Sequence, residues 1–218
     1  MTRERKCGSQ KPAIDERLNF SREKIFKLKP EFCAMPDTNS SNYTYPLLEF
    51  YSRAKLPPPR IEVVADDAVP EPFRTLLVHH NDMTPTLEEF HQSHIHLEIL
   101  RSEHRGGFYF RQVVLRLNHD EKPVEFGANK IFLGLFPEEA QELIRLEQVP
   151  LGRILKECGV RHRTEARAFL RVESDDIIAG AFELEQPMTL YGRKAVISNL
   201  QGKPLSEIIE ILPPAASA

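Results

Sequence analysis

The sequence contains no tryptophan and only three cysteines, Cys7, Cys33 and Cys158. Their odd number and the lack of a Cys-x-x-Cys pair argue against a disulfide framework and favour free thiols in a reducing compartment. No apolar run in the sequence is long enough to cross a membrane, and residues 1–20 lack the apolar stretch of a signal peptide. We therefore expect a soluble, cytoplasmic protein with no membrane partner.

A strong charge of either sign is also missing. The 218 residues carry a formal net charge of −3, which provides no global basic field for a nucleic-acid partner. The Gly106-Gly107 pair lies in neither of the glycine-rich patterns that bind phosphate, so it is better interpreted as a hairpin turn. What the sequence does contain is 41% hydrophobic residues, enough for a compact core in a chain of this length.

The chain is expected to comprise a flexible N-terminal arm, residues 1–41, and one domain, residues 42–218. The arm is mostly polar and charged and ends in small polar residues, a composition typical of segments that do not pack by themselves. No internal repeat divides the domain further.

Strand-like segments dominate the middle and the end of this domain. Three runs rich in β-branched and aromatic residues lie between positions 95 and 133, and turn residues separate them at Gly106 and at residues 118–123. This pattern predicts an antiparallel meander. A further strand is expected over residues 163–172, and the sequence ends in a long hairpin that turns near Gly202.

Helices are expected over residues 45–55, 137–147 and 151–158. Another helix is predicted to begin with Thr84 as its N-cap and Pro85 in the first helical position. Strands come first, helices follow as one inserted pair, and strands end the chain. This order indicates an α+β fold with a single antiparallel sheet and helices on one face.

Six segments of the sequence occur in the order typical of one enzyme family. On them the chain resembles the chorismate pyruvate-lyases, whose fold also occurs in the ligand-sensing domains of certain bacterial transcription regulators. The resemblance covers roughly residues 42–213, and the fourth segment and the final hairpin are its most specific parts. The segments are NDMTPTLEEF (81–90), GFYFRQVVL (107–115), KPVEFGANKIFL (122–133), VPLGRIL (149–155), YGRKAVI (191–197) and GKPLSEIIEILP (202–213).

The resemblance implies a lyase that converts chorismate to 4-hydroxybenzoate and pyruvate, without a metal or an organic cofactor. Loss of pyruvate makes the ring aromatic, so the enzyme mainly has to position the substrate. The aromatic product would lie buried between the sheet and two flaps, and it would supply ubiquinone or other aromatic biosynthesis. The resemblance fixes no oligomeric state.

Site residues follow from the same resemblance. The side chain of Arg111 and the backbone N–H groups of Met83 and Leu151 would bind the carboxylate of the ligand, the guanidinium through two parallel hydrogen bonds. An acid near the chain end would contact the ring hydroxyl. A gap-free alignment places that acid on Ile209, but lengthening both hairpin arms by one residue places it on Glu210. We predict Glu210, and with Arg111 it forms the predicted catalytic pair.

One departure from the family concerns the second carboxylate of chorismate. Some lyases carry an arginine where this sequence has Ala128. Lys130 lies on the same strand face as Ala128, because side chains alternate along a strand. Lys130 is therefore the candidate that would supply the missing charge in the substrate site.

Plainer interpretations exist for these residues. From composition alone, Arg111 and Glu210 would be ordinary surface charges, and only the series of motifs favours a site. The histidines at 91, 94 and 96 suggest a metal, but a zinc site needs three or four ligands with supporting contacts. Solvated or flap-lining histidines are the better interpretation, so we predict no metal.

Two further functions stay open at this stage. The first is a ligand sensor of the same fold without catalysis; residues 1–41 lack the paired helices of a helix-turn-helix, so such a sensor would act through a protein partner and not by binding DNA. The second is a lyase acting on a related carboxylate, since Ala128 changes the expected enolpyruvyl pocket. A fold by itself does not choose among them.

Overall fold

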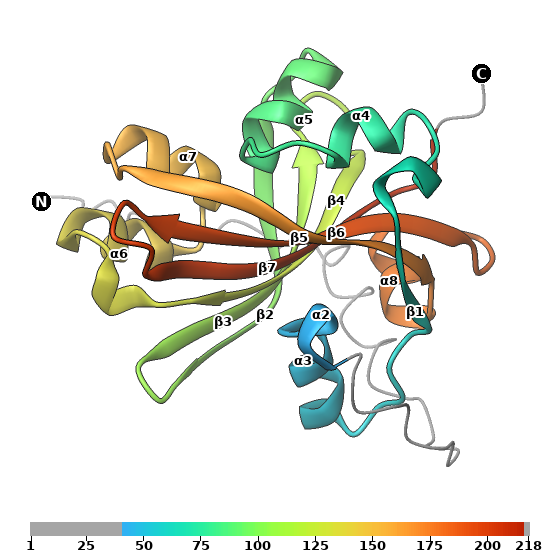
Figure 1. Cartoon of the computed structure of the whole chain (residues 1–218), viewed down its shortest axis with the longest axis horizontal. Helices are drawn as coiled ribbons and strands as arrows, with labels where there is room; N and C mark the ends of the chain where they lie inside the picture. The colour runs from blue at the N-terminus through green and yellow to red at the C-terminus, as the bar shows by residue number, and fades with distance from the viewer. Residues whose placement is uncertain (1–40, 216–218) are drawn as a thin grey trace, which may run out of the picture. The chain divides into compact units, whose positions relative to one another are not determined.

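The computed structural model describes residues 41–215, whose strands form one seven-stranded sheet in the order β1-β5-β6-β7-β4-β3-β2 (Figure 1). Every neighbouring pair is antiparallel. Apart from Ser41, the expected N-terminal arm lies outside the described residues. The strands are β1 (Ile61–Val64), β2 (Ile95–Arg105), β3 (Phe108–Leu117), β4 (Pro123–Ile131), β5 (His162–Glu173), β6 (Thr189–Asn199) and β7 (Pro204–Leu212).

Short helices connect these strands. Among residues 41–215, none of them is long and apolar enough to span a membrane. The helices are α2 (Ser41–Thr44), α3 (Leu47–Ala54), α4 (Phe73–Leu77), α5 (Met83–His91), α6 (Glu138–Leu146), α7 (Leu151–Glu157) and α8 (Asp176–Ala181), with 3-10 turns at Asp66–Ala68 and Leu133–Leu135.

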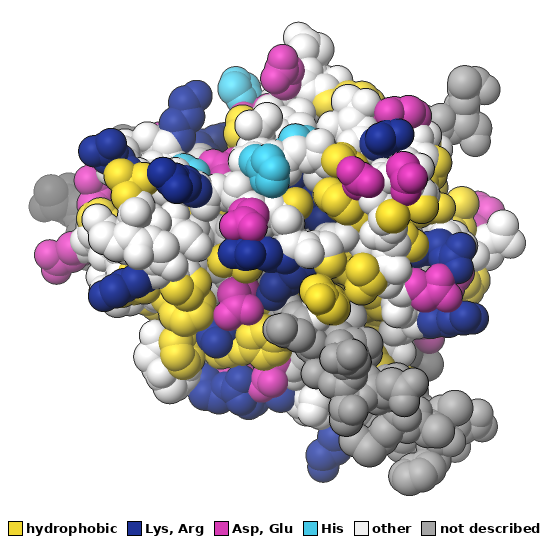
Figure 2. Space-filling view, viewed as in Figure 1, with side chains coloured by type: hydrophobic (Ala, Val, Ile, Leu, Met, Phe, Trp, Pro, Cys, Tyr) yellow, Lys and Arg dark blue, Asp and Glu magenta, His cyan; other side chains and the backbone are white. Residues whose placement is uncertain are grey.

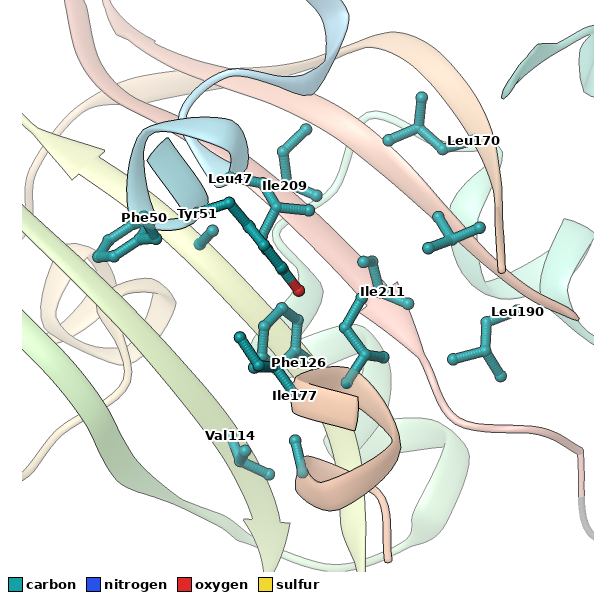
Figure 3. Close-up of a cluster of buried hydrophobic side chains, with 14 of the residues drawn as sticks. Leu47, Phe50, Tyr51, Val114, Phe126, Leu170, Ile177, Leu190, Ile209 and Ile211 are labelled. Atoms are coloured by element: carbon teal, nitrogen blue, oxygen red, sulfur yellow. The ribbon is translucent and has the colours of Figure 1, made fainter. Parts of the chain in front are cut away.

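Helices cover both faces of the sheet. On one face, side chains of α3 and α8 pack on β3 to β7, and Figure 3 shows this cluster around Tyr51 and Phe126. On the other face, α4 and α5 pack over one end of the strands, and α6 and α7 over the other end. The predicted fold class, a single antiparallel sheet with helices, is confirmed. The prediction placed the helices on one face of the sheet, and they cover both. Nearly every residue of β3 and β4 is buried, and such strands need cover on both sides.

The predicted meander is present as β2, β3 and β4, and the predicted final hairpin as β6 and β7. The helices expected at 137–147 and 151–158 are α6 and α7. The start of α5 differs from the prediction: its N-cap is Asp82, and Thr84 and Pro85 lie inside its first turn. Proline is tolerated there because the first backbone N–H groups of a helix have no partner within it.

Candidate functional site

A cavity of about 40 Å³ lies between the sheet and the first turns of α5 and α7. Strands β3, β4 and β7 form its floor, since alternate side chains of each strand point to this face. The lining residues are Asp82, Met83, Thr84, Arg111, Val113, Leu115, Glu125, Asn129, Pro150, Leu151, Gly152, Thr164, Ile197, Ile208 and Glu210. Four of the five predicted site residues, Met83, Arg111, Leu151 and Glu210, are therefore brought together here.

Arg111 is the buried cation of this cavity. It projects from the middle of β3, and only 1% of its surface is exposed. Among residues 41–215, its Nε and Nη1 have no hydrogen-bond partner. Burial lowers the pKa of Arg111, but a guanidinium remains charged in proteins. A buried charge without a partner costs several kcal/mol or more, and an anion in the cavity would offset that cost.

The cover of the cavity consists of the first turns of α5 and α7. Met83 and Leu151 are the first residues of these helices, so their backbone N–H groups have no acceptor within the helix. The turns pack closely: a Cβ on Gly152 would lie 3.1 Å from Oγ1 of Thr84. Arg153 of α7 also holds the cover, with one hydrogen bond to Glu88 and another, of 3.2 Å, to the carbonyl of Ile95.

Glu210 forms a buried salt bridge with Arg193 of β6. Nε of Arg193 lies 2.5 Å from Oε2 of Glu210, and the two residues face each other across the strand pair. The other end of the same guanidinium donates to backbone oxygens of the segment before α5: Asn81 at 3.0 Å, His79 at 3.2 Å and Leu77 at 3.3 Å. Arg193 therefore fixes both the acid and the segment that leads into the cover.

Sequence reasoning missed Arg193 as a functional residue. The motif YGRKAVI was used only as a mark of the family. Pairing β6 with β7 would have placed Arg193 opposite Glu210, but that register is set by the turn and by contacts along the whole hairpin.

The choice between Ile209 and Glu210 is decided by the two faces of β7. Glu210 lines the cavity, while Ile209 is fully buried in the cluster on the other face, near Tyr51 of α3 (Figure 3). Adjacent strand residues point to opposite faces, so the prediction of Glu210 has the geometry that a cavity residue requires.

Lys130 has to be corrected, because it is not among the residues that line the cavity. It shares the opposite face of β4 with Ala128, which is buried in the cluster under α3. Its Nζ lies 4.5 Å, 4.8 Å and 5.1 Å from the ring centres of Phe108, Phe132 and Tyr45. Lys130 and Ala128 do share one strand face, as predicted, but that face lies on the side of the sheet away from the cavity.

Glu125 is a second residue that sequence reasoning missed. It lies on the cavity face of β4, is 4% exposed, and its Oε2 has no hydrogen-bond partner among residues 41–215. Burial raises the pKa of Glu125, and the nearby Glu210 raises it further. The available signal was a lone acid in the apolar run PVEFG, a pattern that indicates an unusual environment.

Asp82 links the cover to β5. It accepts hydrogen bonds from Nε2 of His162 at 2.8 Å and from Oγ1 of Thr164 at 2.5 Å. Burial opposes ionisation of Asp82, but these two bonds, together with the charges of His162 and Arg193, outweigh it and lower its pKa. The hydrogen bond to Asp82 raises the pKa of His162 above its usual value. This pair anchors the start of α5 to the sheet.

Outside this anchor lies a wider hollow of about 410 Å³, which His80, Glu89 and His162 help to line. Figure 2 shows histidine side chains in the upper part of the view, where Figure 1 places α5. On the same face, acidic and basic side chains are interspersed (Figure 2). In the described part of the chain, no three His, Cys, Asp or Glu residues are arranged to hold a metal ion.

Comparison with known proteins bears on the fold. No family model matches the sequence, and no curated protein matches it. PhnF from Mycobacterium smegmatis is similar in structure, with a TM-score of 0.50 at 10% identity over 65% of this chain and 67% of that one.

Two further solved structures are similar at lower scores. The effector domain of the same PhnF gives a TM-score of 0.48 at 9% identity over 63% of this chain and 91% of that one. The GntR-family transcriptional regulator from Enterococcus faecalis V583 gives 0.40 at 10% identity over 56% and 96%. At such identities the likeness to PhnF establishes the chorismate lyase-like fold and carries no function with it.

Proposed function

We propose that this chain binds a small aromatic carboxylic acid in the cavity beneath α5 and α7. The observation that carries the proposal is Arg111, a fully buried guanidinium with two nitrogen atoms that have no partner among residues 41–215. A planar guanidinium matches a carboxylate through two parallel hydrogen bonds. The backbone N–H groups of Met83 and Leu151, which also line the cavity, would be further hydrogen-bond donors to the carboxylate.

The other walls support a flat, mainly apolar ligand. Val113 and Leu115 of β3 and Ile197 and Ile208 of the hairpin strands line the middle of the cavity. Glu210, held by Arg193, supplies an acceptor for a ring substituent. The volume, about 40 Å³, is smaller than the roughly 150 Å³ of a cavity that accepts benzene, so even a single ring requires the cover to move outward.

Isothermal titration with 4-hydroxybenzoate tests this proposal. We expect saturable binding to the full chain and a loss on the order of 100-fold in affinity in Arg111→Met, because the carboxylate then loses its charged partner. Phenol, which lacks the carboxylate, should bind neither protein. Arg171→Met is the matched control, because Arg171 is an exposed strand arginine that pairs with Glu62. Equal affinity of the wild type and Arg111→Met would overturn the proposal.

Chorismate lyase activity is the second candidate function. It is favoured by the meeting of Arg111, Glu210, Met83 and Leu151 around one cavity, the arrangement that the resemblance implies. In this reaction the ether bond between ring and enolpyruvyl oxygen breaks, a ring proton moves to the enolpyruvyl methylene, and pyruvate leaves as the ring becomes aromatic. Arg111 and Glu210 would position the ring for that transfer.

The second carboxylate of chorismate weakens this candidate. Lys130 lies on the other face of the sheet, and Arg193 is occupied by Glu210 and backbone oxygens. Incubation of the full chain with chorismate, followed by detection of 4-hydroxybenzoate above the spontaneous background, distinguishes the two functions. Turnover that Arg111→Met abolishes would support the lyase. Binding of 4-hydroxybenzoate without turnover would support a sensor of the same fold.

A further inference from the structure

The far end of the cavity holds a second carboxyl group that the proposed function does not use. Glu125 is 4% exposed and lines the cavity with Glu210. The two acids lie on neighbouring strands of one face, because Gly127, two residues after Glu125, pairs with Glu210. Nothing in the resemblance to chorismate pyruvate-lyases assigns a role to Glu125.

The carboxyl group of Glu125 extends over Gly127. A Cβ built on Gly127 would lie 3.0 Å from Cγ2 of Val113, 3.2 Å from Oε1 of Glu125 and 3.5 Å from Nδ2 of Asn129, so a side chain at this position would crowd the acid. Among residues 41–215, Oε2 of Glu125 has no partner. A buried polar atom without a partner costs about 1–3 kcal/mol, so its presence requires an explanation.

The protonation state of Glu125 follows from its surroundings. Burial raises its pKa, and Glu210 of β7 raises it further, while Arg193 of β6 and Arg111 of β3 lower it with smaller effect. Glu210 already accepts from Arg193. Two adjacent buried acids of this kind favour one charge between them, so Glu125 is the partner that holds a proton and has an O–H to donate.

We propose that Glu125 determines ligand specificity: its carboxylic acid donates a hydrogen bond to a ring hydroxyl, and that hydroxyl in turn donates a hydrogen bond to Glu210. This inference rests on the proposed function, since Arg111 must first hold the carboxylate end. A hydroxyl satisfies both acids because it accepts and donates at once. A methyl group in its place does neither and would leave Glu125 without a partner. The selected ligands are therefore hydroxylated aromatic acids.

The test compares 4-hydroxybenzoate, 4-methylbenzoate and benzoate on the full chain by isothermal titration. The wild type should prefer the hydroxyl over the methyl compound by a factor on the order of ten or more. Glu125→Leu should reduce this preference by roughly tenfold while benzoate still binds. Glu125→Gln keeps an N–H donor at the same place and should retain most of the preference. Glu165→Leu is the matched control, an exposed strand acid that pairs with Arg167.

Each outcome decides between the two proposals. Failure of all three acids to bind the wild type would remove the proposed function and this inference with it. If benzoate binds and Glu125→Leu keeps the full preference for the hydroxyl, the role of Glu125 is refuted while the proposed function stands. Equal loss of preference in Glu125→Gln and Glu125→Leu would refute the donor role, because the amide also donates.

Discussion

Arg193 and Glu210 meet in a salt bridge of 2.5 Å whose side chains are 0% and 6% exposed. Arg111 is as deeply buried on the same face of the sheet, but it forms no ion pair with any acid among residues 41–215. The two arginines should therefore affect the stability of the fold in opposite ways: the paired Arg193 stabilises it, and the unpaired charge of Arg111 does not. Arg193 is paired within the fold, and Arg111 is the residue that we propose binds a ligand.

Arg193→Met should destabilise the protein strongly. It leaves the buried Glu210 without its partner and removes the hydrogen bonds to Leu77, His79 and Asn81. We expect the free energy of unfolding to fall by about 3–5 kcal/mol in urea titrations. Adding Glu210→Leu should recover part of this loss, because the unpaired charge is then gone. A loss below about 1 kcal/mol in the single variant would contradict a stabilising role for this pair.

Arg111→Met should not destabilise the free protein. Methionine fills similar space without a buried charge, so the free energy of unfolding should stay the same or rise by roughly 1 kcal/mol. Saturating 4-hydroxybenzoate should raise the Tm of the wild type, since a ligand that binds the folded state stabilises it, and should raise that of the variant much less. Differential scanning calorimetry with and without the acid measures both effects. Strong destabilisation of the free variant would show that Arg111 has a structural role instead.

Lys130→Met should leave ligand affinity unchanged. The lysine lies on the face opposite Arg111, over three aromatic rings and 3.8 Å from Glu207. Its loss should lower the free energy of unfolding by about 1 kcal/mol, the usual scale of a partly buried cation–π contact. A drop in affinity comparable to that of Arg111→Met would return Lys130 to the ligand site.

The pair of His162 and Asp82 should make stability depend on pH. Its hydrogen bond raises the pKa of His162 above 6.5, against the opposing effect of burial. A histidine whose pKa is raised by folding stabilises the folded state below its unfolded pKa, and this contribution is lost as pH rises through the folded value. The Tm of the wild type should therefore fall more between about pH 6 and about pH 8 than that of His162→Gln. His94→Gln is the control, because the side chain of His94 is 81% exposed. Its Tm should change with pH as the wild type's does.

Local sequence patterns predicted six of the seven strands and missed the short edge strand β1 (Ile61–Val64). Alternation and turn residues predict the meander around Gly106 and the hairpin around Gly202, and both are present. They misplaced the start of α5 at Thr84, because the cap is Asp82. The side chain of Asp82 is bound to β5 rather than to its own helix, which no local pattern reveals.

For the site, the sequence by itself determined which side chains share a strand face, because a residue and the next but one always point the same way. It therefore separated Glu210 from Ile209 and grouped Lys130 with Ala128. Only the tertiary structure decided which face forms the cavity, and so brought Arg111, Glu125 and Glu210 together and left Lys130 outside. Helices pack on both faces of this sheet, and the side that retains a cavity depends on contacts between segments far apart in the chain.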